Sequence, residues 1–156
     1  QRSEHRKWLN CFDEVDAVIF VVALSEYDQT LTESQDTNRM VEAIDLFHSV
    51  CNNRAFIDTS ILLFLNKKDI FAEKIMYSHI AAQEPFADYT GERQNFDQGV
   101  MYFIHKFKRC LVDGEFSDNF IHVTCATDTN TMEFVLDSTR TIIMTDNLRR
   151  SCFLVD

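Results

Sequence analysis

An uninterrupted apolar run near the amino terminus limits the folds open to this chain. Residues 16–24 read DAVIFVVAL, which is rich in β-branched and aromatic side chains and does not alternate with polar residues. A strand covered on both faces in a parallel sheet has this pattern, whereas a strand with one wet face alternates. Residues 60–65 (SILLFL) and 120–125 (FIHVTC) form similar runs, the second more polar. The three runs predict three buried parallel strands.

Helical patterns follow each predicted strand. The first helix is predicted from an apolar face at helical spacing, formed by Met40, Ile44, Phe47 and Cys51. A second apolar stripe covers residues 96–111, and Gly114 is a suitable stop for that helix. A third helix is predicted from Asn130, because Glu133 three residues later resembles a capping box, and its apolar residues continue toward Leu148. The alternation of strands and helices predicts half of a doubly wound α/β sheet in one domain.

Composition excludes several classes of function. The three glycines, Gly91, Gly99 and Gly114, cannot be arranged into GxGxxG or GxxxxGK, so the chain carries no glycine-rich phosphate loop. A net charge of -10 repels nucleic acid, which is therefore not an expected partner. The five cysteines form no CxxC pair and lie mostly in apolar segments, so we expect reduced core thiols and no metal site.

A polar motif follows the second predicted strand. Asn66-Lys67-Lys68-Asp69 comes directly after residues 60–65, and ligands of open α/β sheets bind beyond the carboxyl ends of the strands. The carboxylate of Asp69 is able to accept from the adjacent N1–H and N2–H donors of guanine, and the aliphatic stem of Lys67 is able to lie on a purine face. The simpler alternative is a polar turn with Asp69 as a helix cap.

The loop after the third predicted strand is also polar. Residues 124–129 read TCATDT, and a small residue there would let a backbone N–H approach the guanine carbonyl. By itself this segment is better explained as a strand-to-helix turn rich in capping residues. Together with NKKD at a neighbouring strand end, it favours a guanine site.

Longer segments carry a resemblance to a known family. The stretches QRSEHRKW, CFDEVDAVIFVVALSEYD, NRMVEAIDLFHSVCNN, FIDTSILLFLNKKDIFAEKI and HVTCATDTNTMEFVLDSTRTII resemble the carboxyl-terminal half of a heterotrimeric G protein α subunit. The resemblance implies a parallel-sheet Ras-like GTPase fold, of which this chain holds only the carboxyl-terminal half. Residues 1–156 would then be a partial GTPase domain, cut before the second switch and lacking the P-loop and the helical insertion domain.

The resemblance also implies roles for individual residues. Gln1 matches the catalytic glutamine that orients the attacking water. The nucleotide-binding residues implied are Asn66, Lys67, Asp69, Cys125, Ala126 and Thr127. The switch and partner contacts implied are Arg2, His5, Arg6, Lys7, Trp8 and Glu42. His5 stands where the family usually has Arg, and we expect it to pair with Glu42.

The family resemblance sets the expected function. It implies a signal transducer that couples cell-surface receptors to effectors through a GTP/GDP switch with intrinsic GTP hydrolysis, and with Mg²⁺ ligands in the missing half. Implied partners are the βγ dimer, a receptor at the carboxyl-terminal helix, effector enzymes and regulators of GTP hydrolysis, at the cytoplasmic face of the plasma membrane. The start at QRSEHRKW favours a cut made inside a longer protein. The alternative is a non-catalytic truncated module that binds partners through the switch and the receptor-facing helix.

Overall fold

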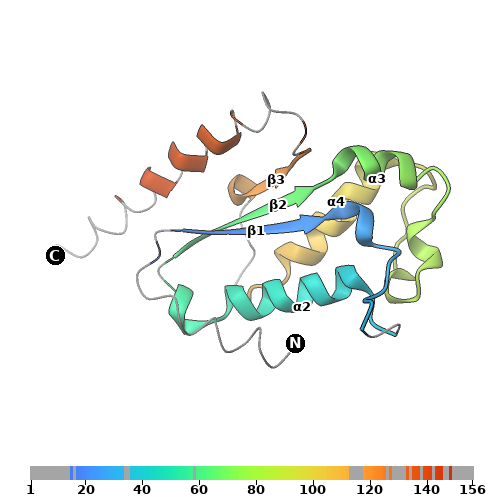
Figure 1. Ribbon diagram of the computed structural model, residues 1–156, viewed down its shortest axis with the longest axis horizontal. Helices are drawn as coiled ribbons and strands as arrows, with labels where there is room; N and C mark the ends of the chain where they lie inside the picture. The colour runs from blue at the N-terminus through green and yellow to red at the C-terminus, as the bar shows by residue number, and fades with distance from the viewer. Residues whose placement is uncertain are drawn as a thin grey trace.

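A parallel three-stranded sheet organises the computed structural model (Figure 1). The structure describes residues 15, 17–33, 36–57, 59–112, 118–125, 127, 133, 135–137, 139–141, 143–145 and 148. The strands are β1 (Ala17–Ala23), β2 (Ser60–Asn66) and β3 (Ile121–Val123), in the spatial order β1-β2-β3. Because all neighbours are parallel, their carboxyl ends meet at one edge. The predicted α/β architecture with three parallel strands is confirmed.

Among the described residues, three uninterrupted α-helices connect and cover these strands. They are α2 (Arg39–Cys51), α3 (Lys68–Lys74) and α4 (Phe96–Lys108). Asn38 starts α2, since its Oδ1 accepts from the backbone N–H groups of Met40 at 2.8 Å and Val41 at 3.3 Å. Figure 1 shows α2 on one side of the sheet and the helical residues 135–137, 139–141 and 143–145 on the other. Within the described residues, no helix is long and apolar enough to cross a bilayer.

Strand β2 is the centre of the core, whereas β1 is covered unevenly. Residues 60–65 are all buried, as the apolar run predicts. In β1, Phe20 meets Phe47 of α2 with ring centroids 5.1 Å apart, but Ile19 is 49% and Val21 58% exposed. The prediction that β1 is covered on both faces is therefore wrong within the described part. Helix α2 packs on only one face, and no described element covers Ile19 and Val21 to the same degree.

Helix α4 ends earlier than its apolar stripe predicts. The helix stops at Lys108, and Leu111 lies beyond it. The N–H of Cys110 donates to the Phe107 carbonyl at 3.0 Å, which tightens the last turn. The side chain of Asn52 then holds the next segment, donating to the Cys110 carbonyl at 2.8 Å and accepting from Val112 N–H at 3.0 Å. These contacts satisfy the backbone without further helix, and Gly114 lies outside the described residues.

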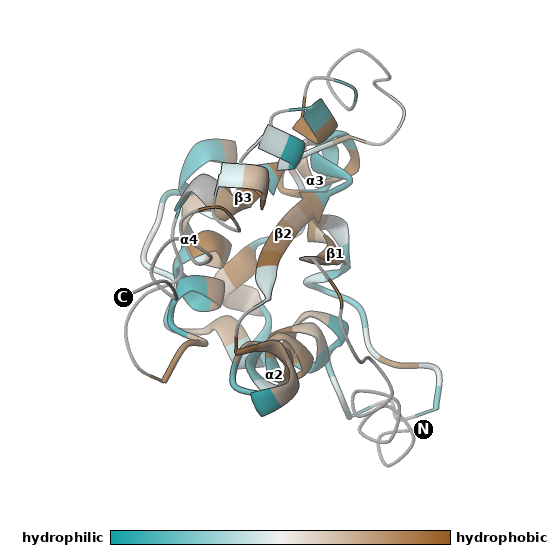
Figure 2. Ribbon diagram, turned by 90° about the vertical axis from the view of Figure 1, so that its left-hand side faces the viewer, coloured by the Kyte–Doolittle hydropathy of each residue, from teal (hydrophilic) through white to brown (hydrophobic). Residues whose placement is uncertain are grey.

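A cluster of aromatic side chains joins α3 to α4. Phe103 of α4 is fully buried, and its ring centroid lies 6.1 Å from Phe71, 5.4 Å from Phe86 and 6.0 Å from Tyr27. Gly99 permits this close approach, because a Cβ there would lie 2.8 Å from Cδ1 of Ile75. Figure 2 shows most of β2 coloured as hydrophobic, whereas the helices mix hydrophobic and hydrophilic residues. This core fixes the position of α3, whose first turn carries Asp69.

Candidate functional site

The turn between β2 and α3 has an unusual backbone conformation. Lys67 precedes the first residue of α3 with φ 60° and ψ 39°, the left-handed region that non-glycine residues seldom adopt. Its carbonyl accepts from Phe71 N–H at 3.0 Å, and the next N–H, of Lys68, donates to the Thr124 carbonyl at 3.2 Å. Thr124 N–H in turn donates to the Leu65 carbonyl at 2.9 Å. These bonds tie the NKKD turn to the end of β3.

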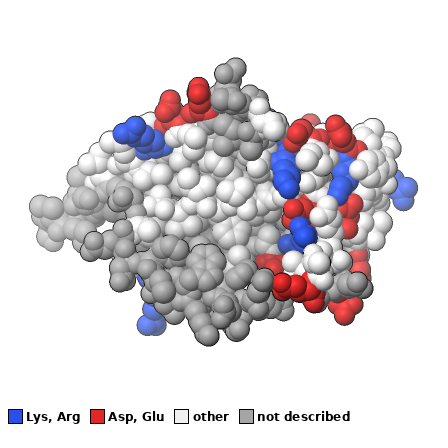
Figure 3. All heavy atoms as spheres, viewed as in Figure 1, with Lys and Arg blue, Asp and Glu red and all other residues white. Residues whose placement is uncertain are grey.

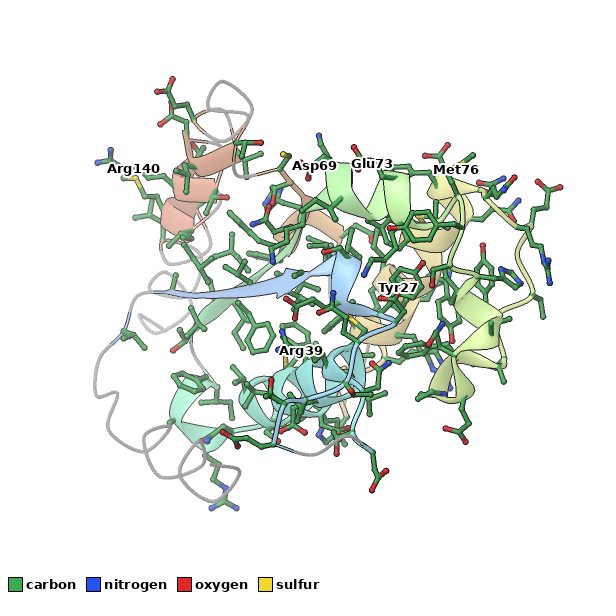
Figure 4. The ribbon with its side chains drawn as sticks, turned by 45° about the vertical axis from the view of Figure 1, so that its right-hand side comes forward. Tyr27, Arg39, Asp69, Glu73, Met76 and Arg140 are labelled. Atoms are coloured by element: carbon green, nitrogen blue, oxygen red, sulfur yellow. The ribbon has the colours of Figure 1, made fainter. Side chains whose placement is uncertain are left out.

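Asp69 is an exposed carboxylate in the first turn of α3 (Figure 4). A hydrogen bond from the backbone N–H of Ile70 lowers the pKa of Asp69, and a second from the Cys125 thiol lowers this pKa further. The side chain is therefore ionised at neutral pH and keeps acceptor capacity toward solvent. The alternative that Asp69 caps the helix is wrong, because Lys67 occupies the cap position.

The end of β3 lies against the NKKD turn. Thr124 donates through its hydroxyl to Oδ1 of Asn66 at 3.4 Å. Cys125 is buried, and its sulfur lies 2.9 Å from the hydroxyl oxygen of Thr127. The structure thus brings together the described residues of both predicted motifs, Asn66, Lys67 and Asp69 with Cys125 and Thr127. Ala126 lies outside the described residues.

The end of β1 contributes a polar network that sequence reasoning missed. Lys74 of α3 donates to Oδ1 of Asp28 at 2.7 Å and to the Ser25 carbonyl at 2.8 Å. Ser78 donates to the second oxygen of Asp28 at 2.8 Å and accepts from the Tyr27 hydroxyl at its carbonyl. The available signal was the position of SEYD directly after an apolar strand, because that segment reaches the same edge of the sheet.

A third carboxylate at this edge, that of Glu26, is shared by two cations. Oε1 of Glu26 lies 3.5 Å from Nζ of Lys67, and Oε2 lies 3.4 Å from a guanidinium nitrogen of Arg39. Lys67 belongs to the NKKD turn, whereas Arg39 is the first residue of α2. Figure 3 shows basic and acidic side chains interspersed at one end of the molecule, beside a surface with few charges. Glu26 therefore links α2 to the NKKD turn.

Of the remaining predicted site residues, only Glu42 lies within the described part of the chain. Glu42 is half-buried in the first turn of α2. The other members of the predicted catalytic and switch set lie outside the described residues: Gln1, Arg2, His5, Arg6, Lys7 and Trp8. The His5 to Glu42 pair therefore stays a prediction. In the part of the chain that the structure describes, no group of three or more His, Cys, Asp or Glu residues is placed to hold a metal ion.

The fold and the two joined loops define an α/β protein with a polar site at the carboxyl edge of a parallel sheet, where such proteins bind ligands. The family model described as "G-protein alpha subunit" matches residues 1–143. The chain is 48% identical over 149 residues to the guanine nucleotide-binding protein alpha-3 subunit of Caenorhabditis elegans, covering 96% of the chain and 41% of that relative. It is 47% identical to the G(o) subunit alpha of Locusta migratoria, with the same coverage. The chain belongs to the G-protein alpha subunit family and spans about two fifths of the length of these relatives.

Proposed function

We propose that this chain supplies the base-reading and partner-facing part of a guanine-nucleotide switch protein with a Ras-like GTPase fold. The observation that carries the proposal is the junction of the two strand-end loops, in which Lys68 N–H donates to the Thr124 carbonyl at 3.2 Å and the carboxylate of Asp69 is exposed in the first turn of α3. Asp69 accepts from N1–H and N2–H of guanine, and the stem of Lys67 lies on the purine face. Asn66 and the loop Cys125 to Thr127 complete the binding site around the base. GTP and GDP are the ligands.

Hydrolysis belongs to the complete protein, by which we mean this chain preceded by the segment that its longer relatives carry. Gln1 would orient the attacking water, and the preceding segment would hold Mg²⁺, which would supply neutralisation of phosphate charge. The names of the relatives, which are guanine nucleotide-binding subunits, support this proposal.

Signalling partners follow from the same proposal. The βγ dimer covers Arg2 to Trp8 in the resting state, and effectors use the groove between that segment and α2. A receptor contacts the helix after Asn130, and regulators of GTP hydrolysis act on the switch. The complete protein works at the cytoplasmic face of the plasma membrane.

Nucleotide binding by the complete protein and by the 156-residue chain tests the proposal. The complete protein is expected to bind fluorescent analogues of GTP and GDP and not to bind the corresponding fluorescent analogue of ATP. The reason is that adenine lacks the paired donors from which Asp69 accepts in guanine. The chain alone is expected to bind GTP weakly and to hydrolyse none, since base contacts without phosphate contacts leave most binding energy unmade. Tight GTP binding by the chain alone would contradict this division. Binding of partners with no nucleotide binding by the complete protein would favour the non-catalytic module instead.

A Gln1→Leu variant of the complete protein tests the catalytic role. GTP hydrolysis is expected to fall at least about tenfold, because Leu cannot orient water, while GTP affinity changes less than about twofold. Single-turnover hydrolysis and equilibrium binding measure the two effects separately. Gln98→Leu, which makes the same change on the exposed side of α4, serves as the control. Unaltered hydrolysis in Gln1→Leu would remove Gln1 from the mechanism.

A further inference from the structure

A non-glycine residue in the left-handed region needs surrounding contacts to keep it there. Among the described residues only Lys67 and Gln94 have this conformation, which costs free energy and persists where neighbours enforce it. A backbone hydrogen bond from Phe71 N–H to the Lys67 carbonyl, at 3.0 Å, holds the main chain of Lys67. This bond does not restrain the Lys67 side chain. The side chain is 46% exposed and carries no capping bond. Its orientation therefore depends on what its ammonium group meets.

That ammonium group meets Glu26, whose own position is restrained. The side chain of Glu26 is 27% exposed, and its second oxygen lies 3.4 Å from the Arg39 guanidinium. Arg39 is held in turn, because its Nε donates to the Thr30 carbonyl at 3.2 Å and its backbone N–H donates to the Gln29 carbonyl at 2.8 Å. Two ion pairs, Arg39 with Glu26 and Glu26 with Lys67, thus connect the start of α2 to the NKKD turn.

We propose that Glu26 is a positioning residue that orients Lys67 over the guanine base, and that Arg39 couples this orientation to the start of α2. The inference rests on the proposed guanine site. Lys67 acts on the base through its stem, so a carboxylate that fixes its far end lowers the entropy lost when nucleotide binds. A partner that displaces the start of α2 also displaces Arg39, which frees Glu26 and loosens Lys67. The rate of nucleotide release then changes when a partner binds α2, although that partner does not contact the nucleotide.

The test measures GDP release from the complete protein by stopped-flow displacement of a fluorescent GDP. Glu26→Gln keeps the shape of the side chain and removes its charge, and it is expected to speed release roughly two- to fivefold, the range of partly exposed ion pairs. Arg39→Gln is expected to speed release by a smaller factor. The double variant is expected to match Glu26→Gln alone, because Arg39 acts through Glu26.

A Lys67→Met background separates positioning from general loosening of the fold. Met keeps an apolar stem but no ammonium group, so Glu26→Gln is expected to have no further effect on release in that background. The control is Asp88→Asn, because Asp88 also joins two partners, Tyr102 at 2.5 Å and Lys106 at 2.6 Å, and neither partner belongs to the NKKD turn. This variant is expected to release GDP at the unmodified rate.

The possible failures are distinguishable. If the complete protein binds no guanine nucleotide, the proposed function and this inference fall together. If it binds GDP and Glu26→Gln releases it at the unmodified rate, the inference alone is overturned. A Glu26→Gln effect that persists in the Lys67→Met background would overturn it too, since Glu26 would then act through the fold rather than through Lys67.

Discussion

An Asp69→Asn variant of the complete protein is expected to bind xanthine nucleotides in preference to guanine nucleotides. The carboxylate offers two acceptors to the N1–H and N2–H donors of guanine, whereas the Asn amide offers one acceptor and one donor. Xanthine has an N1–H donor and a carbonyl at C2, which match the amide. We expect the ratio of the two affinities to change by roughly a hundredfold or more, because a base left with an unmatched polar group is rejected strongly.

Competition between GDP and xanthosine diphosphate measures this change directly. The matched control is Asp97→Asn, since Asp97 is the second residue of α4 just as Asp69 is the second residue of α3, and both are exposed. That variant is expected to retain guanine preference. If Asp69→Asn retained it as well, Asp69 would not read the base, and the simpler role of a charge in the first turn of α3 would suffice.

The strands and α2 were predictable because their signals are local. The apolar run of residues 60–65 predicts the fully buried β2, and the apolar face from Met40 to Cys51 coincides with α2. The run of residues 16–24 predicts β1 equally well but not its exposed face, because burial depends on which element packs there. The residue pattern therefore predicted where the strands lie in the sequence better than it predicted how deeply each strand is buried.

The juxtaposition of the two predicted motifs could be foreseen from the sequence, whereas the detailed geometry between them could be foreseen only in part. Parallel topology alone places NKKD beside the loop after β3, since both follow strands that end at one edge. The left-handed backbone of Lys67 carries no sequence signal, because a lysine rather than a glycine occupies the position. The ion pairs of Glu26 with Arg39 and Lys67 were likewise not predictable from the sequence. These residues are distant in sequence, and only the fold determines where their long side chains point.

The stability of the site depends on the aromatic cluster beneath α3. Phe71 lies two residues after Asp69 and is fully buried, and its ring meets those of Phe103 and Tyr27, at centroid distances of 6.1 and 5.5 Å. Tyr27 follows β1 and Phe103 belongs to α4, so three segments that are distant in sequence meet around one ring. Loss of a ring here removes contacts that hold α3, and with it Asp69, against the sheet.

Phe103→Ala is accordingly expected to lower the free energy of unfolding by about 3–5 kcal/mol, the cost of a large cavity in a rigid core. Four aromatic neighbours on several elements line the cavity, the nearest being Tyr102 at 5.2 Å, so collapse around the smaller side chain would have to move α4 as a whole. Urea unfolding of the 156-residue chain, followed by circular dichroism, measures the loss. Met101→Ala is the control, because Met101 is 48% exposed on the same helix and is expected to cost less than about 1 kcal/mol. Equal losses in the two variants would show that the aromatic cluster does not anchor α4 to α3.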